Sequence, residues 1–506
     1  MPSTDRLPKR RIAAVGLFFV ASVVASACSA DTAQKVVLST SAPLRVGIGG
    51  APASSPERGV QQFLASLTLE GLLRVNQEGR LEPWLAKGWK VSSDGLRFTI
   101  ELRENVKFHD GSPVTASTVV EFLRANLPKA LRTMFDDVEA ISADNEHAIT
   151  VKFQRPSSFV GDSLYESPIQ KGNTPAIGTG PFLLARADAS SAQQDSTHLA
   201  AFSRYYLGSP AIQQIDITTY PNTRAAWAEL LRGRLDMLYE VGIDAIDLTK
   251  DSRVALYAFD RPYQYMILLN TKSPKLKSSD VRRALNRAID RSMIVHEGLV
   301  GHGTPSSGPV SNHHWAFGNS GSTFTFDPQA AEAVLNKTGS GRLTLNCLTP
   351  ATAPYEHLAI IVKQQLQAVG VDVSIAEVAP ESLSSVFSKP DFEALLIDVA
   401  SGWSLFWPYR WWHSKGGSNA MGFSSSVVDA ALDRIRHAVN DDEYRSAVQA
   451  FQTAISDDPP AIFLAWGDRS RAVNNRFDVS AEKGRDVVST LRLWRPTADK
   501  GSATHD

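Results

Sequence analysis

The greatest concentration of side chains able to contact a ligand lies in Leu395–Phe423. This stretch reads LLIDVASGWSLFWPYRWWHSKGGSNAMGF, and its aromatic residues crowd into ten positions: Trp403, Phe406, Trp407, Tyr409, Trp411 and Trp412. Aromatic side chains in loops and at strand ends are large, rigid surfaces for ligand contact. Gly402, Pro408 and Gly416-Gly417 favour a loop over a helix. We therefore predict that this aromatic segment lines a binding cleft, with burial in a core as the alternative for each single residue.

Catalytic chemistry is not indicated by any motif in the chain. His296-Glu297 is followed by Val300 at the position where a zinc-protease helix needs its second histidine, and no Gly-x-Ser-x-Gly sequence occurs. Ile177–Gly180 is rich in glycine, but no Lys-Ser or Lys-Thr pair follows it, as a phosphate-binding loop requires. We predict that the protein is not an enzyme and uses no cofactor.

The composition is that of an ordinary soluble globular protein with more than one domain. The chain has 506 residues, of which 43% are hydrophobic and 21% charged, and its net charge is -1. A chain of this length is longer than a domain with a single compact core usually is, so we expect two or three domains. A nearly neutral chain lacks the basic excess typical of nucleic-acid binding, and we expect no nucleic-acid partner.

Residues 1–28 are typical of an export signal. Basic residues precede Ile12–Val24, an apolar run that is too short to span a membrane comfortably. Ser26-Ala27-Cys28 then resembles a lipoprotein cleavage box. We predict a signal peptide over residues 1–27 and acylation of Cys28, with cleavage near Ala27 and no lipid as the alternative. Residues 28–42 would be a linker. The only other cysteine is Cys347, so we expect no disulfide.

The elements that must position the aromatic segment follow from the spacing of apolar residues. Trp89–Val91 and Arg97–Leu102 read as a hairpin, and Thr115 can cap the helix after it. Apolar residues alternate along Arg261–Thr271, which predicts a strand. In the second half of the chain strands alternate with helices, which indicates an α/β arrangement. The expected elements there are helices over 327–336, 357–369, 427–439 and 442–456, and strands over 343–347, 371–376 and 461–466.

The residue order in Leu81–Leu123 is specific enough to suggest a family. A Pro-Trp-Leu-Ala-Lys-Gly-Trp run, a Ser-Asp-Gly turn and a Val-Lys-Phe-His-Asp-Gly stretch follow one another with almost no gap. This order resembles the signature region of the family 5 extracellular solute-binding proteins, the peptide and nickel receptors of ABC importers. Ile177–Phe182 and a helix expected over Ser278–Ile294 resemble two further segments of that family.

The resemblance implies a periplasmic-binding-protein-like fold of mixed α/β class. Such a protein has two lobes that close on a ligand by hinge motion, and here the first lobe would carry an accessory subdomain. Lobe I would comprise residues 43–262, with the accessory subdomain at about 80–175. Lobe II would comprise residues 263–460, and residues 461–506 would return to lobe I.

The same resemblance indicates which residues would surround the ligand. Ser54 and Ser55 stand where family members usually carry an acidic Leu-Asp-Pro motif at the rim of the cleft. Tyr263, Tyr265 and Asn270 lie on the first expected crossing between the lobes. Together with the aromatic segment, these residues are our candidate binding site.

Asp398, Arg410 and His413 are the polar candidates in the aromatic segment. In peptide-binding members of the family an aspartate there holds the ligand's α-ammonium group, but this chain has no Asp between Asp398 and Asp429. Asp398 could take that role from a displaced position, or it could simply end a strand. Some nickel receptors of the family hold a metal chelate with Arg, His and aromatic residues, which makes Arg410 and His413 candidates for chelate binding. We expect no metal site built by the chain alone.

The resemblance implies a lipid-anchored receptor at the outer face of the cell membrane or in the periplasm. We expect a monomer that binds a small solute, most plausibly a peptide, and delivers it to an ABC permease and its ATPase subunits. Two alternatives stay open. The ligand could be a sugar or a nickel chelate, or the protein could be a receptor-like lipoprotein that acts as a regulator or scaffold without transport.

Overall fold

The computed structural model describes most of the chain between residues 42 and 497. Residues 1–41, with Cys28 and the expected signal peptide, and residues 50–58, with Ser54 and Ser55, lie outside the described residues. The described ranges are 42–49, 59–172, 177–185, 196–243, 245, 253–318, 324–337, 342–379, 382–388, 392–401 and 403–497. Within these ranges no helix is both long and apolar enough to cross a membrane.

The largest sheet has 11 strands in the order β15-β14-β16-β12-β17-β11-β1-β10-β9-β8, with β13 paired to β17. Parallel pairs such as β1–β10 and β14–β15 stand beside antiparallel pairs such as β12–β17. The mixed sheet confirms the expected mixed α/β class. Its strands are β1 (Leu44–Gly49), β8 (Phe182–Leu184), β9 (Ser196–Ala201), β10 (Gln214–Tyr220), β11 (Met237–Leu238), β12 (Val254–Leu269), β13 (Gly303–Pro305), β14 (Leu343–Pro350), β15 (Val371–Val378), β16 (Ala394–Ala400) and β17 (Ala461–Asn474).

Strands β12 and β17 are longer than the sequence patterns predicted. The patterns gave 261–271 and 461–466, but the two strands pair with each other from Val254 opposite Asn474 to Leu268 opposite Ala461. The extra length comes from cross-strand pairing, which alternation within one strand does not reveal. The register between β12 and β17 shifts between Asp260 and Gln264.

A second sheet has the order β4-β5-β7-β6. Its strands are β4 (Ala86–Val91), β5 (Arg97–Leu102), β6 (Val138–Ala143) and β7 (Ala148–Phe153), and α2 (Ala116–Leu131) and α3 (Phe159–Glu166) accompany it. The predicted hairpin is confirmed. So is the cap, since the Thr115 side chain accepts from the Thr118 N–H in a capping box.

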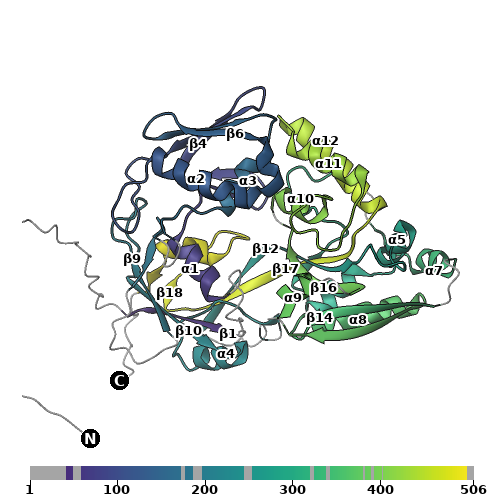
Figure 1. Cartoon of the computed structure of the whole chain (residues 1–506). Helices are drawn as coiled ribbons and strands as arrows, with labels where there is room; N and C mark the ends of the chain where they lie inside the picture. The colour runs from purple at the N-terminus through teal and green to yellow at the C-terminus, as the bar shows by residue number, and fades with distance from the viewer. Residues whose placement is uncertain are drawn as a thin grey trace, which may run out of the picture. The chain divides into compact units, whose positions relative to one another are not determined.

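The remaining elements surround these two sheets. Figure 1 shows α8 along β14 and β16 and α4 beside β1. These elements are α1 (Val60–Thr68), β2 (Leu73–Val75), β3 (Leu81–Pro83), η1 (Arg132–Asp137), α4 (Thr223–Leu231), α5 (Ser279–Arg287), α6 (Arg291–Met293), η3 (Ile294–Gly298), α7 (Pro328–Asn336), α8 (Tyr355–Ala368), α9 (Leu383–Ser388), α10 (Phe406–Trp412), α11 (Ser426–Arg436), α12 (Asp441–Asp457), β18 (Phe477–Asp478), η5 (Val487–Leu493) and β19 (Arg495–Pro496).

One expected helix, Ser278–Ile294, is interrupted. The α-helix α5 ends at Arg287, and Asp290 caps the short α6 by accepting from the Ser292 and Met293 N–H groups. Arg291 is buried and donates to the carbonyl groups of Ser306 and Phe463. Because a straight helix would carry Arg291 away from these acceptors, the interruption follows from the burial of this one guanidinium.

The largest apolar core is shared by the four-stranded sheet region and α10–α12. Phe159 on α3 contacts Phe406 and Tyr409 on α10 edge to face, with ring centroids 6.1 and 5.5 Å apart. Beneath them the Arg436 guanidinium lies 2.5 Å from the Asp137 carboxylate, and both side chains are buried. Figure 1 shows α2 and α3 next to α10, α11 and α12. We call this contact the α3–α10 joint.

Candidate functional site

A cavity of about 600 Å³ brings together residues from widely separated parts of the chain. Its wall includes α1, the β2 region, the end of α3, the crossing strands β12 and β17, the start of α10 and η5. A cavity of this size lies within the usual range for small-molecule sites, about 300–1,000 Å³. The aromatic, charged and amide side chains of its lining include Gln62, Glu70, Arg74, Tyr165, Glu166, Tyr239, Glu240, Tyr263, Trp403, Trp407, Arg469, Arg471, Arg485 and Asp486.

The aromatic wall of the cavity contains Trp403, Trp407 and Tyr263, all predicted from the sequence, together with Tyr165. The Trp407 indole N–H donates to the Glu166 carboxylate over 3.0 Å, which links α10 to the end of α3. The Arg410 guanidinium lies 4.8 Å from the centre of the Trp407 ring and supports one of its faces.

Phe406–Trp412 of the aromatic segment form the helix α10. The prediction of a loop is wrong for these residues. Pro408 is the third residue of α10, and the first turn of a helix tolerates proline because its N–H groups have no partner within the helix. Gly416 follows the helix at a close approach, since a Cβ there would lie 2.4 Å from the Arg410 carbonyl oxygen. Proline and glycine therefore mark the two ends of a short helix.

The side chains of α10 lie on two faces of the helix, one buried in the core and one toward the cavity. Phe406, Tyr409, Trp412 and His413 are buried, at the spacing of the core face of a helix. His413 stacks on Tyr409 with ring centroids 4.4 Å apart, and its Nδ1 accepts from the Lys415 N–H. Trp411 is half-buried and donates its indole N–H to the Ala400 carbonyl over 3.0 Å. These residues, like Arg410, lie outside the cavity lining.

Asp398 and Tyr265 are buried behind the cavity wall. The Asp398 carboxylate accepts from the Tyr355 hydroxyl over 2.5 Å and lies 3.7 Å from the Arg469 guanidinium. Arg469 itself lines the cavity. Burial acts to lower the pKa of Arg469, but the electrostatic attraction of Tyr265 and Asp398 raises it overall. Asn270 lies elsewhere, donating to the Phe392 carbonyl and accepting from the Lys272 N–H.

Part of the cavity wall consists of paired charged side chains. These residues were not predicted from the sequence. The Arg471 guanidinium lies 2.6 Å from the Asp486 carboxylate and 3.7 Å from the centre of the Tyr239 ring. Burial acts to lower the pKa of Arg471, but Asp486 and Tyr239 raise it overall, so it stays a cation. No local motif marks this pair, because its members lie 15 residues apart on β17 and at the start of η5.

A second group of charges centres on Glu82. Its carboxylate accepts from both Arg74 and Arg485 over 2.8 Å, and these two arginines line the cavity. Burial acts to raise the pKa of Glu82, but the hydrogen bonds and charges of the two arginines lower it overall. One carboxylate thus faces two guanidinium groups at the wall.

Glu70 is the buried carboxyl group of the cavity wall. It accepts hydrogen bonds from the Tyr205 hydroxyl over 2.6 Å and from the Thr179 hydroxyl over 2.8 Å. Burial raises the pKa of Glu70 to about 7, even though these hydrogen bonds act to lower it. Thr179 belongs to the glycine-rich stretch Ile177–Gly180, and this contact gives the stretch a structural role.

The described residues contain no group of three or more His, Cys, Asp or Glu side chains that could hold a metal ion. Cys347, the cysteine within the described ranges, is buried, and burial raises the pKa of its thiol to about 12. A thiol with so high a pKa stays protonated near neutral pH.

Comparison with solved structures identifies the fold. NikZ from Campylobacter jejuni in complex with Ni(L-His) is similar over 90% of this chain and 99% of that chain, with a TM-score of 0.78 and 21% identity. The oligopeptide-binding protein AppA from Bacillus subtilis in complex with a nonapeptide covers the same shares, with a TM-score of 0.75 and 20% identity. At these identities the likeness concerns the fold alone.

Comparison of sequences adds relatives and a family. The probable D,D-dipeptide-binding periplasmic protein DdpA of Escherichia coli K12 is 25% identical over 430 residues, 77% of this chain and 80% of that protein. The nickel-binding periplasmic protein of the same strain is 27% identical over 373 residues, 65% of this chain and 68% of that protein. Residues 80–420 match the model of the bacterial extracellular solute-binding proteins, family 5. These matches confirm the resemblance carried by Leu81–Leu123, and the chain belongs to family 5 of the bacterial extracellular solute-binding proteins.

Proposed function

We propose that the protein captures a peptide or a similar small solute in the 600 Å³ cavity and delivers it to an ABC permease with its ATPase subunits. Membership of the solute-binding family supports a receptor rather than an enzyme. The observation that carries the proposal is the cavity itself, in which an aromatic wall faces several arginine–carboxylate pairs. We further propose that the receptor is a monomer, exported by the signal peptide over 1–27 and anchored to the membrane through acylated Cys28.

The chemistry of the cavity supports a peptide over the alternatives. A peptide offers apolar side chains, amide groups and one charge of each sign. Trp403 and Trp407 offer apolar surface, while Arg471, Arg485 and Glu240 supply charges of both signs. A nickel chelate is less well supported, because Arg410 and His413 lie outside the lining.

We propose distinct roles for the residues predicted from the sequence. Tyr263, Trp403 and Trp407 would contact the ligand directly, and Ser54 and Ser55 would stand at the rim. Most of the other predicted residues would hold the wall in place, as Arg410 does for Trp407. They are Tyr265, Asp398, Tyr409, Arg410, Trp411, Trp412 and His413, whereas Asn270 lies away from the cavity and would have neither role.

Asp398 is better suited to position Arg469 than to hold an ammonium group. Its carboxylate is only 3% exposed, and both Tyr355 and Arg469 already interact with it. Because Asp398 is buried, separating it from Arg469 would leave a buried carboxylate without its neighbouring cation, which is unfavourable. A ligand ammonium would therefore have to compete with an interaction that the fold needs.

We propose that the lobes predicted from the sequence, residues 43–262 with 461–506 and residues 263–460, close on the ligand. The chain passes between them on β12 and β17. The register shift between Asp260 and Gln264 supports a hinge there, because an interrupted ladder has fewer hydrogen bonds to resist bending.

A thermal-shift screen tests the proposed function. The protein without residues 1–28 would be mixed with di- to pentapeptides, oligosaccharides or nickel chelates. A ligand present in excess of its dissociation constant stabilises the folded protein and so raises its melting temperature. At a hundredfold excess the free energy of unfolding rises by about 2.7 kcal/mol. We expect peptides to raise it. If no compound does so while the protein is folded, the transport function is contradicted and the scaffold alternative gains.

A further inference from the structure

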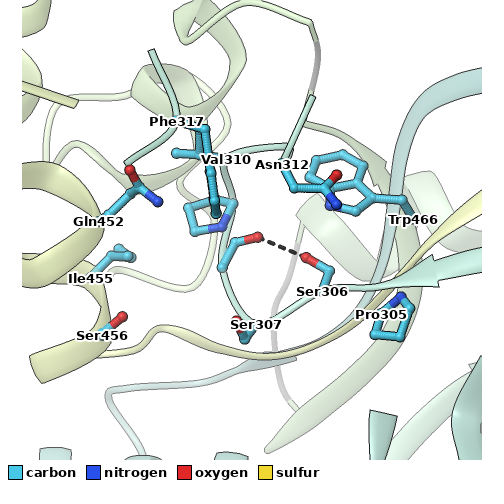
Figure 2. Close-up of a pocket in the computed structure, with 12 residues that line it drawn as sticks. Pro305, Ser306, Ser307, Val310, Asn312, Phe317, Gln452, Ile455, Ser456 and Trp466 are labelled. Atoms are coloured by element: carbon cyan, nitrogen blue, oxygen red, sulfur yellow. Dashed lines mark hydrogen bonds between the residues drawn. The ribbon is translucent and has the colours of Figure 1, made fainter. Parts of the chain in front are cut away.

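A second cavity, of about 210 Å³, shares no lining residue with the first. Figure 2 shows its wall, which is built from the 305–312 loop, Phe317, the inner face of α12 and Trp466 of β17. Its volume lies below the range of about 300–1,000 Å³ typical of sites for drug-sized ligands. Any occupant is therefore smaller than the solute proposed for the main cavity.

Hydrogen bonds hold this wall in a fixed shape. The Ser306 N–H donates to the Leu464 carbonyl over 3.0 Å, and the Ser306 hydroxyl donates to the Gly308 carbonyl over 2.9 Å, as the dashed line in Figure 2 shows. Opposite them, the Gln452 amide pairs with the Gly318 backbone through both its oxygen and its nitrogen. The cavity thus needs little ordering when it is filled, which lowers the cost of binding.

The lining contains no charged side chain. Its twelve residues are prolines, a glycine, apolar residues, the hydroxyls of Ser306, Ser307 and Ser456, the amides of Asn312 and Gln452, and the Trp466 indole. A charged ligand would lose its hydration there without gaining a counter-ion, which is costly. Hydroxyl and amide groups beside an aromatic ring instead suit a neutral ligand with several hydroxyl groups.

Gln264 supports this wall from behind. The residue is fully buried, and its Nε2 donates to the Ser306 hydroxyl over 2.5 Å and to the Gly308 carbonyl over 2.7 Å. These two hydrogen bonds fix the positions of Ser306 and Gly308, which line the cavity.

We propose that this cavity is a second binding site, separate from the main cavity, for a small uncharged polyhydroxylated solute such as a polyol or a pentose. The Trp466 ring would offer it an apolar face, and Ser307 and Asn312 would supply hydroxyl and amide groups. Trp466 lines this cavity and Arg469 lines the main cavity. Both residues lie on β17, so neighbouring parts of one strand line the two cavities.

Ligand-observed NMR with ribose and glycerol as probes tests this site on the protein without residues 1–28. We expect millimolar binding of a probe to the wild type and no binding of ribose 5-phosphate, its charged counterpart. Ser307→Phe fills the cavity and should weaken probe binding at least tenfold. Gln62→Trp fills the main cavity instead and should leave probe binding unchanged.

Asn312→Leu provides a second variant, because Asn312 is exposed at the cavity mouth and its replacement leaves the hydrogen bonds of the wall intact. It should also weaken probe binding. The proposal is overturned if neither probe binds the folded wild type, if binding survives both Ser307→Phe and Asn312→Leu, or if Gln62→Trp abolishes it. Failure of peptides to bind in the thermal-shift screen would contradict the transport function and leave this site unaffected.

Discussion

Glu70 shows how one residue can tie the cavity wall to the surrounding fold. Its carboxyl group is 4% exposed and lies between the β2 region and the hydroxyls of Thr179, Tyr205 and Tyr206. Burial raises the pKa of Glu70 from 4.5 to about 7. The folded protein therefore binds a proton at this site over a range of pH in which the unfolded chain has already released it.

This proton linkage predicts the pH dependence of stability. Because the folded state binds more protons, the free energy of unfolding falls as the pH rises through the window between the two pKa values. A shift of this size corresponds to about 3 kcal/mol between about pH 4 and pH 8. Glu70→Gln keeps a hydrogen-bond acceptor but cannot titrate, so urea unfolding of this variant should lose about that much of the pH dependence.

The matched control is Glu139→Gln, which removes an exposed carboxylate on β6. Its unfolding free energy should follow the wild-type pH profile. If Glu70→Gln also follows the wild-type profile, Glu70 does not titrate with a raised pKa.

Trp407 and Trp411 lie four residues apart on α10, but only Trp407 lines the cavity. Trp407→Ala should therefore weaken binding of a peptide ligand about tenfold, since a buried aromatic contact is often worth at least 1.4 kcal/mol. Trp411→Ala should lower the melting temperature but keep the dissociation constant. Isothermal titration calorimetry of both variants with the same peptide measures these dissociation constants. Equal losses of affinity would show that binding depends on the integrity of α10 and not on contact with the Trp407 side chain.

At the scale of elements, the α3–α10 joint contains the buried ion pair of Arg436 and Asp137, and Asp137 also lies 2.7 Å from the exposed Arg155 guanidinium. Arg436 lies 2.5 Å from Asp137 and donates to the Tyr409 hydroxyl over 2.9 Å. Asp137→Ala would leave this guanidinium buried without its carboxylate, which typically costs about 3–5 kcal/mol. Chemical denaturation should show a loss in that range.

The control is the exposed ion pair of Lys87 and Glu101 on the four-stranded sheet. Water screens an exposed ion pair and makes its contribution to stability small, so Glu101→Ala should change the free energy of unfolding far less than Asp137→Ala does. If Asp137→Ala and Glu101→Ala lower the free energy of unfolding by similar amounts, Arg436 must contact water or another partner when Asp137 is absent.

Several elements could be predicted from sequence because their signals are local. The hairpin around Ser92–Gly95 and the cap at Thr115 depend on residues adjacent in the chain, and both are confirmed. The aromatic segment was harder, because Pro408 and Gly416 were interpreted as loop residues when they mark the ends of α10. The Arg471–Asp486 pair was missed altogether, because two distant segments meet there only after folding.

At the scale of the whole molecule, the α3–α10 joint limits how the proposed lobes can open. It joins the region that we propose as an accessory subdomain to α10 and α11 of the proposed second lobe, through a shared apolar core and hydrogen bonds. The Ser158 N–H donates to the Arg436 carbonyl over 2.8 Å, and the Ser158 hydroxyl donates to the Ile435 carbonyl over 2.9 Å. Separating these surfaces would expose Phe159, Phe406 and the Asp137–Arg436 pair to water.

We therefore predict that this joint stays closed without ligand and that opening takes place elsewhere. Hydrogen exchange of the Ser158 amide reports on the joint, and the Ile100 amide in the centre of the four-stranded sheet serves as the internal reference. In the ligand-free protein both amides should be protected. Fast exchange at Ser158 with slow exchange at Ile100 would mean that the joint opens together with the lobes.

The proposed function requires that the 600 Å³ cavity is the place where the solute binds. Gln62 on α1 lines this cavity and is half-buried, so Gln62→Trp would fill part of it without removing a core side chain. The most direct test is a calorimetric titration of a peptide identified by the screen into the wild type and into this variant. We expect the peptide to bind the wild type and not to bind Gln62→Trp, while the melting temperature of the free protein stays the same. Equal affinities in the two proteins would contradict the proposal.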